Sequence, residues 1–239
     1  MFELFGLFSE KEKITLERFL SCLTSFSVEG GYSGDSTKHY KGAVLDFSQN
    51  FYNFKQNYNT LKTYNKNVIV ILPPFYKVAE FYAKFSEKII IKFCGERKFY
   101  TPVHPYVTEE ELRCVLNEFS PFKEKCLIML SGSSFEYDML SHQKTVLTNN
   151  QAVLKALVHS SSIYYDKISQ NSYFTYKNEN RRPKFVWVED TKSLSFKHNL
   201  IKNSGFCGIC WESPYIMSEG NWETLYSAYN KANKKENCE

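Results

Sequence analysis

Short apolar runs alternate with segments of helical periodicity along most of the chain. The run Val68–Leu72, rich in β-branched residues and followed by Pro73 and Pro74, is typical of a parallel strand buried on both faces. The pattern predicts six core strands, at residues 2–8, 43–47, 68–72, 89–93, 126–130 and 206–211. Because strands that alternate with helices form right-handed βαβ units, we expect an α/β fold with a parallel sheet.

The segments between these strands carry the spacing and capping signals of helices. Helices are predicted at residues 10–25, 51–64, 78–85, 108–119, 151–160, 194–202 and 222–232. Thr108 is a predicted N-cap, as is Ser9, which forms a possible capping box with Glu12. A longer excursion over residues 131–183 includes the first half of a small hairpin that pairs residues 173–176 with 185–188. No glycine-rich phosphate fingerprint follows the first strand, which disfavours a nucleotide-binding doubly wound fold.

Composition narrows the classes of function. The chain has 239 residues and a formal net charge of +4, too small and too dispersed to indicate nucleic-acid binding. No apolar run of about 18 residues is present, so no membrane span is expected, and the first residues do not have the pattern of a signal peptide. The 17% aromatic content indicates either aromatic-lined surfaces or the codon bias of an AT-rich genome.

The seven cysteines do not form a recognisable disulfide framework, because their number is odd and their spacing scattered. Cys207 and Cys210 have the spacing of a redox pair or half a zinc site, but no second pair or nearby histidine completes a metal site. Because they fall in a predicted buried strand, we interpret both as small core side chains. The sequence predicts neither a metal nor a cofactor.

Six segments resemble parts of a known family. They are Gly42-Ala-Val-Leu-Asp-Phe-Ser48, Leu72-Pro-Pro, Ile128-Met-Leu-Ser-Gly-Ser-Ser-Phe-Glu-Tyr-Asp138, Ile163-Tyr-Tyr-Asp, Val186-Trp-Val-Glu-Asp-Thr-Lys-Ser and Gly205-Phe-Cys-Gly-Ile-Cys-Trp211-Glu. In order and spacing they resemble glycoside hydrolase family 18, the chitinase-like TIM barrels, from the third barrel strand to the eighth. Within that family the resemblance is greatest to the chitinase domain-containing (stabilin-interacting chitinase-like) group and to spore-cortex glucosaminidase-like proteins.

The departures from the family pattern concern its catalytic residues. Members hydrolyse β-1,4 N-acetylglucosaminyl bonds with a glutamic acid and with the acetamido group of the substrate as nucleophile. In this sequence the acid position falls on Ser48 and the preceding aspartate on Asp46. The two earlier aspartates fall on Lys41 and Val44, and the Tyr and Asp that hold the acetamido group fall near Cys94 and Gly95. Because a serine hydroxyl cannot protonate a glycosidic oxygen near neutral pH, the family chemistry is expected to be lost, and the chain is expected not to be an enzyme.

The resemblance also implies an incomplete or degenerate TIM barrel, with about six of eight strands and a small insertion before the last βα unit. We expect a single domain over residues 1–239 that starts near the third barrel strand, with the insertion within residues 131–188. A truncated chain, a partner that completes the sheet and a degenerate barrel each explain the missing strands. The family resemblance suggests a secreted, endomembrane or lysosomal protein, although no signal peptide is present in this sequence.

Ligand-binding candidates lie near the expected carboxyl ends of the strands, where such barrels place their sites. Trp211 and Asp46 are candidates for sugar contact, with packing in the barrel as the alternative for each. Tyr137 and Asp138, on a predicted loop, and Glu212 complete the predicted site.

Other polar side chains near this end offer weaker candidates. Glu189, Asp190 and Glu212 are carboxylates that a displaced active site could use. His104 and His142 are single loop histidines, interpreted as solvated.

Three hypotheses follow. The leading one is a catalytically inactive chitinase-like barrel that binds a chitin- or N-acetylglucosamine-type glycan, or another partner, at the C-terminal face of its strands. The second is an active glycoside hydrolase that uses a displaced carboxylate, Glu189 or Glu212. The third is a non-enzymatic scaffold that pairs with another chain through an exposed sheet edge.

Overall fold

The computed structural model describes residues 103–212 without a break. It also describes residues 3–7, 25–29, 42–46, 59, 68–74, 86, 88–93, 220–221 and 223. For residues 3–7, 25–29, 42–46 and 68 the structure describes the backbone alone. The predicted helices at residues 10–25, 51–64, 78–85 and 222–232, and the capping box at Ser9, lie outside the described residues apart from isolated positions.

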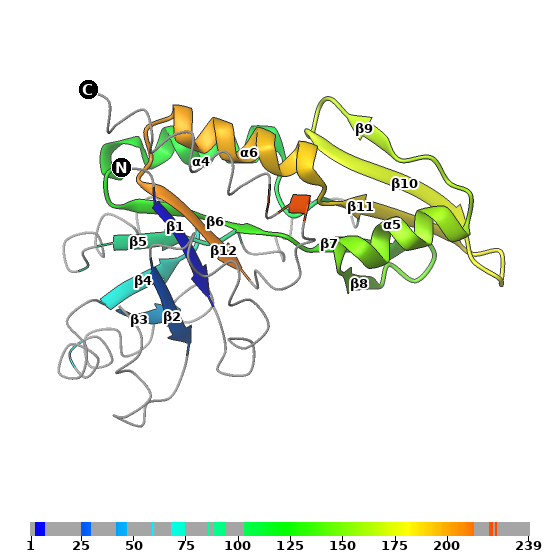
Figure 1. Cartoon of the computed structure of the whole chain (residues 1–239), viewed down its shortest axis with the longest axis horizontal. Coiled ribbons are helices and arrows are strands. Elements are labelled where there is room, and N and C mark those ends of the chain that lie inside the picture. Colours follow the sequence, from blue (N-terminus) through cyan, green and yellow to red (C-terminus); the bar gives the residue numbers. More distant parts are fainter. Residues whose placement is uncertain are drawn as a thin grey trace.

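Among the described residues, seven parallel strands form a closed barrel in the order β1-β12-β6-β5-β4-β3-β2 (Figure 1). They are β1 (Glu3–Leu7), β2 (Ser25–Glu29), β3 (Gly42–Asp46), β4 (Val68–Leu72), β5 (Lys88–Ile91), β6 (Cys126–Ser131) and β12 (Gly208–Glu212). The α/β class and all six predicted strands are confirmed. The sequence missed β2, because this short segment of alternating polar and apolar residues lies at the end of a predicted helix.

The pairing of the barrel strands tests whether the sheet has an unpaired edge that a protein partner could complete. The first strand pairs with β12 on one side and with β2 on the other, so that each described barrel strand has two neighbours. The bare sheet edge that motivated a scaffold or a completing partner is therefore absent among the described strands.

The barrel strands bury both of their faces. One set of side chains, including Ile91, Ile128 and Trp211, packs in the same cluster as residues of the helices outside the barrel. The alternate set forms a second cluster made up of strand side chains. Its buried members are Ile69, Ile71, Ile90, Leu127, Met129 and Cys210. Because side chains alternate along a strand, the second set faces the barrel interior.

Helices α4 (Glu109–Glu118) and α6 (Thr191–Asn203) lie side by side along the barrel, and a short 3₁₀ turn, η3 (Ser120–Phe122), follows α4 (Figure 1). The predicted N-cap of α4 is confirmed: the Thr108 hydroxyl accepts from the backbone N–H of Glu111, whose carboxylate accepts from the backbone N–H of Thr108. The Asp190 side chain caps α6. No helix among the described residues is long and apolar enough to cross a membrane.

A second sheet of five antiparallel strands, in the order β8-β7-β11-β10-β9, lies beside the barrel (Figure 1). Its strands are β7 (Ser134–Asp138), β8 (Lys144–Leu147), β9 (Tyr164–Asp166), β10 (Asn171–Lys177) and β11 (Pro183–Val188), and helix α5 (Asn149–Val158) packs on it. The predicted hairpin is confirmed as the pairing of β10 with β11.

The sequence placed Tyr137 and Asp138 on a loop, and this prediction is wrong. Both residues belong to β7, which pairs with β8 and β11, and both are buried. The chain leaves β6 at Ser131 and enters β7 at Ser134, so the predicted loop is only a short link between two strands.

Candidate functional site

A small polar cluster lies at the carboxyl end of the barrel strands. The Lys92 ammonium, one residue beyond β5, lies 3.1 Å from the Glu212 carboxylate at the end of β12. The Tyr106 hydroxyl donates to the same carboxylate at 3.4 Å. Glu212 follows the barrel-facing Cys210 by two residues, and Lys92 follows the barrel-facing Ile90 by two, so both continue the interior register. This is the end at which barrels of this kind hold their ligands.

Lys144 connects this cluster to the second sheet. Its ammonium lies 3.9 Å from the centre of the Phe135 ring. Lys144 is exposed as a whole residue, but partial desolvation of its ammonium over the Phe135 ring lowers its pKa, and the field of the Glu212 carboxylate opposes that shift. Lys144 therefore lies within electrostatic reach of Glu212.

Four aromatic residues form a row across the second sheet: Phe135, Trp187, Tyr173 and Tyr164. They are successive cross-strand partners on β7, β11, β10 and β9, so they project from the same face of the sheet. The ring centres of Tyr173 and Trp187 are 5.7 Å apart, and those of Tyr164 and Tyr173 are 6.0 Å apart. We call these four residues the aromatic row.

The aromatic row leads towards the barrel end. The ring of Tyr106, whose hydroxyl donates to Glu212, is stacked against Phe135 with centres 6.4 Å apart and planes 7° from parallel. Helix α5 covers the opposite face of the sheet, where it packs with the alternate residues Phe174 and Val186. At the outer end of the row Tyr164 is 59% exposed. The exposed part of the row therefore runs from Tyr164 to Trp187, and the buried Phe135, at 6% exposure, links it to Tyr106 and the polar cluster.

The sequence did not identify Lys92, Tyr106 or the aromatic row. Lys92 gave no signal, since lysines were interpreted as solvated. The predicted hairpin did contain a usable signal for the row. Phe185 and Trp187 are two residues apart on one strand and so lie on one sheet face, and Tyr173 lies on the strand paired with it.

Trp211, predicted as a sugar contact, is completely buried. It lies in the cluster that packs against the outer helices, whereas its neighbour Cys210 faces the barrel interior. Its indole N–H has no hydrogen-bond partner among the described residues. Of the two roles that the sequence allowed for Trp211, sugar contact and packing, this geometry fits packing.

Asp46 ends β3, and its backbone is in register with Ile71 of β4. It thus lies at the same end of the barrel as Glu212. The structure describes its backbone and not its side chain. Ser48 and the predicted positions Lys41, Cys94 and Gly95 are also outside the described residues.

Tyr137 and Asp138 are engaged in contacts within the second sheet. The Tyr137 hydroxyl donates to the His104 carbonyl at 2.6 Å. The backbone N–H groups of Ser141 and Leu140 and the Lys184 ammonium, at 2.9 Å each, all donate to the Asp138 carboxylate and lower its pKa. Asp138 therefore stabilises the β7–β8 turn, and neither residue belongs to the polar cluster at the barrel end.

Glu189 is only 4% exposed and pairs with the buried Lys197 at 2.5 Å. Burial raises the pKa of Glu189, and the Lys197 ammonium opposes the shift. Asp190, the neighbouring candidate, caps α6 and accepts from the Ser172 hydroxyl at 2.5 Å. Of the carboxylates considered for a displaced active site, Glu212 alone belongs to the polar cluster.

The single histidines have local partners or are exposed. The His104 ring hydrogen-bonds to the Pro105 carbonyl at 2.7 Å, and its other nitrogen lies 3.6 Å from Glu111. His142 is exposed and has a positive φ of 56°.

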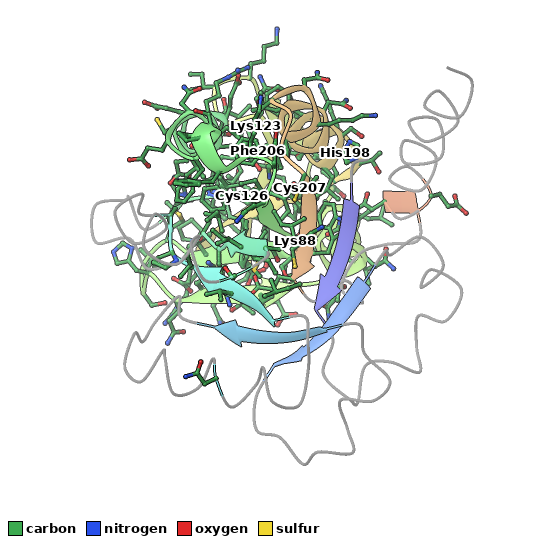
Figure 2. All side chains as sticks on the ribbon, turned by 90° about the vertical axis from the view of Figure 1, so that its left-hand side faces the viewer. Lys88, Lys123, Cys126, His198, Phe206 and Cys207 are labelled. Carbon is green, nitrogen blue, oxygen red and sulfur yellow. The ribbon has the colours of Figure 1, made fainter. Side chains whose placement is uncertain are left out.

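Cys207 and Cys210 pack with the barrel strands. The Cys207 thiol lies against the backbone of Cys126, with Sγ 3.2 Å from the carbonyl oxygen, and Figure 2 labels the two close together near Phe206. Cys207 and Cys210 are not bonded to each other. No group of three or more potential metal ligands occurs among the residues the structure describes.

Solved structures of known proteins share this architecture. The chain is similar to a chitinase from Chromobacterium violaceum ATCC 12472, with a TM-score of 0.75, 12% identity and coverage of 94% of this chain and 98% of that one. It is also similar to a glycoside hydrolase family 18 N-acetylglucosaminidase from Paenibacillus barengoltzii, with a TM-score of 0.69, 10% identity and coverage of 95% and 99%. At these identities the likeness shows the fold, which is the chitinase-like fold of family 18.

One relative is similar in sequence over part of the chain. Over 84 residues the chain is 33% identical to the cortical fragment-lytic enzyme of Bacillus subtilis (strain 168). The matched residues make up 35% of this chain and 20% of that enzyme. The match thus spans about a fifth of the relative's length. No model of a known family matches the chain. The comparisons do not show a likeness to the stabilin-interacting chitinase-like group.

These comparisons contradict the expectation that the chain is not an enzyme. The relative is a lytic enzyme, and the structural neighbour from Paenibacillus is a glycosidase. The expectation rested on Ser48, which lies outside the described residues. The second hypothesis had already allowed for a displaced carboxylate, Glu189 or Glu212.

Proposed function

We propose that this protein is a glycoside hydrolase that binds a β-linked N-acetylglucosamine-type glycan along the aromatic row and cleaves it beside Glu212. The observation that carries the proposal is the continuity of the two features: Phe135 of the row is stacked against Tyr106, and the Tyr106 hydroxyl donates to Glu212.

The aromatic row suits a carbohydrate because a pyranose ring has an apolar C–H face and a polar rim. Aromatic side chains supply a rigid apolar surface at little cost in conformational entropy. The sheet spaces the rings of the row one strand apart, about 4.8 Å in the pairing direction. A glycan laid across the strands would meet the rings of Tyr164, Tyr173 and Trp187 in turn, while its hydroxyls stay in water, and the buried Phe135 would support the inner end of the row.

Glu212 supplies the proton-transfer group of the proposed reaction. In the first step Glu212 protonates the leaving oxygen, the acetamido oxygen of the substrate bonds to the anomeric carbon, and the glycosidic C–O bond breaks. In the second step a water oxygen bonds to the anomeric carbon, the bond to the acetamido oxygen breaks, and Glu212 takes a proton back from the water. The ion pair with Lys92 and the hydrogen bond from Tyr106 hold the carboxylate in place. Asp46, which ends β3 at the same end of the barrel, is proposed as a further sugar contact.

The names of the similar proteins support this substrate class. One is a chitinase and another an N-acetylglucosaminidase, and both share the fold over nearly the whole chain. The inactive protein suggested by the sequence is not retained.

Turnover tests the catalytic half of the proposal. A chromogenic N-acetylglucosaminide should be hydrolysed by the wild type, and Glu212→Gln should lower kcat by about 10²- to 10⁴-fold, the usual loss for a positioned acid or base. Glu118→Gln, at an exposed carboxylate at the end of α4, is the matched control and should retain full activity. Equal turnover by Glu212→Gln and the wild type would exclude Glu212 as the catalytic carboxylate.

Binding tests the other half. Calorimetry with the N-acetylglucosamine hexamer should show that Trp187→Ala weakens affinity about tenfold, or about 1.4 kcal/mol. The control is Leu157→Ala, which removes a 75% exposed side chain from α5, on the other face of the sheet. If the two variants bind alike, the aromatic row is not the binding surface.

A further inference from the structure

The buried ion pair between Glu189 and Lys197 plays no part in the proposed reaction. Both side chains are almost completely buried, at 4% and 2% exposure, and the Lys197 ammonium also donates to the Asn171 amide oxygen at 2.8 Å. A second oxygen of Glu189 has no hydrogen-bond partner among the described residues. Removing two charges from water is costly, and an apolar pair of similar size is often equally stable. The pair is therefore poorly explained as a source of stability alone.

The location of the pair suggests another role. The backbone N–H of Glu189 donates to the Ser134 hydroxyl at 3.1 Å, and that hydroxyl lies 3.2 Å from the Asn149 amide oxygen, to which it donates. The Asn149 amide in turn donates to the Glu189 carbonyl, as does the amide of Asn221 at 3.2 Å. One polar network thus ties together the starts of β7 and α5 and the end of β11.

The same network reaches the elements beside the barrel. The Asn171 amide, at the start of β10, donates to the Val107 carbonyl just before α4 at 3.2 Å. Lys197 lies in the middle of α6, which packs against β12. The ion pair therefore joins the second sheet to the two helices that pack on the barrel.

Two rings of the aromatic row lie next to this junction. Phe135 directly follows Ser134, and Trp187 precedes Glu189 by two residues. Phe135 is the ring that is stacked against Tyr106, which in turn donates to Glu212. Any rotation of the sheet at the junction would move the row relative to Glu212.

We infer that Glu189 and Lys197 are positioning residues, which hold the aromatic row at a fixed distance from Glu212 and so set the affinity for long glycans. This inference rests on the proposed function. The sequence offered Glu189 as a replacement acid, but its burial in the ion pair keeps it from a substrate. Its proposed effect is indirect, through the position of the second sheet.

The experiment replaces the pair by apolar residues, Glu189→Leu with Lys197→Met, so that no unpaired charge remains buried. We expect a Tm close to that of the wild type and unchanged kcat and KM on a short chromogenic N-acetylglucosaminide. For the N-acetylglucosamine hexamer, KM and the calorimetric Kd should rise about tenfold, since small misplacements of binding groups are costly. The control removes the exposed pair of Arg113 and Glu109, 2.7 Å apart on α4, by Arg113→Gln with Glu109→Gln, and should change nothing.

Single variants separate positioning from catalysis. Glu189→Gln should retain turnover of the short substrate, and its complete loss with intact hexamer binding would make Glu189 catalytic and overturn the inference. An unchanged hexamer Kd in the apolar double variant would also overturn it. If the wild type binds the hexamer but hydrolyses nothing, the hydrolysis proposed above fails, while the hexamer Kd of the double variant still decides the positioning role.

Discussion

The barrel and the second sheet use their strands in different ways. In β5 the consecutive residues Ile89, Ile90 and Ile91 are all 0% exposed, because one face packs under helices and the other fills the barrel. In β10 the buried Phe174 faces α5, while its neighbour Tyr173 belongs to the partly exposed aromatic row. A strand buried on both faces contributes packing along its length and can offer a polar group only at its end, as β12 does with Glu212, whereas a strand with one open face can bind a ligand along that face.

The two regions also differ in how they hold their helices. Apolar contacts join the barrel to α4 and α6. Helix α5 is held in part by Glu136 of β7, whose carboxylate lies 2.9 Å from the Lys155 ammonium and accepts from the Tyr176 hydroxyl at 2.7 Å. Burial raises the pKa of Glu136, but the hydrogen bonds and charges of Lys155, Tyr176 and Lys184 outweigh burial and lower it overall. The barrel thus depends on packing, and the second sheet partly on charge.

Thiol labelling should show the largest contrast between barrel and surface. Burial raises the pKa of Cys126 in β6 to about 12, whereas Cys114 is exposed on α4. A thiol with that pKa is about 10⁻⁴ thiolate at pH 8, so Cys126 should react at least about 10³-fold more slowly than Cys114. Peptide mapping after timed alkylation measures both rates, and similar rates would show that the barrel opens readily.

Truncation in the barrel should have the next largest effect. Leu127→Ala leaves a cavity at a 0% exposed position in the barrel interior and should lower the free energy of unfolding by about 2–5 kcal/mol. Val146→Ala, at a 56% exposed position on β8, should change it by less than about 0.5 kcal/mol. Urea unfolding measures both, and equal losses would remove the proposed difference between the two regions.

Acid should weaken the second sheet before the apolar barrel. The N–H groups of Ser141 and Leu140 and the Lys184 ammonium lower the pKa of Asp138 below its unfolded value of about 4. The folded state thus binds fewer protons, and the stabilisation is present above pH of about 4 and is lost as pH falls through the folded pKa. Asp138→Asn should lower stability at pH 7 and flatten its loss between pH 5 and 2. Parallel pH curves for variant and wild type would contradict this role.

The smallest effect is expected on the outer face of α5. Leu157→Asn replaces a 75% exposed side chain, and the free energy of unfolding should stay within about 0.5 kcal/mol of the wild type. Thermal unfolding is the measurement. A large loss would mean that this face of α5 is covered by another part of the molecule.

Much of the fold could be predicted from local signals. The run Val68–Leu72 was identified as a buried parallel strand because β-branched residues without polar alternation fit a sheet covered on both sides. Thr108 was identified as an N-cap because its hydroxyl and Glu111 satisfy backbone groups within a few residues. The strand β2 was missed because its short alternation gives no run of this kind.

The candidate site was less predictable. Glu212 was named from its place after an apolar strand, but its partners Lys92 and Tyr106 are distant in sequence and gave no signal. Trp211 was assigned to the site because the sequence of a strand buried on both faces does not say which set of side chains faces inward. The structure assigns Cys210 to the interior and Trp211 to the helix side.

The sequence by itself determined the six predicted barrel strands and the N-cap of α4, because propensity, periodicity and capping act over a few residues. Only the tertiary structure decided how the strands close and which residues meet. Phe135, Trp187, Tyr173 and Tyr164 are spread over four strands, and their alignment depends on the register of three strand pairs. A one-residue slip in any pair would turn a ring to the opposite face, so the aromatic row exists only in the folded sheet.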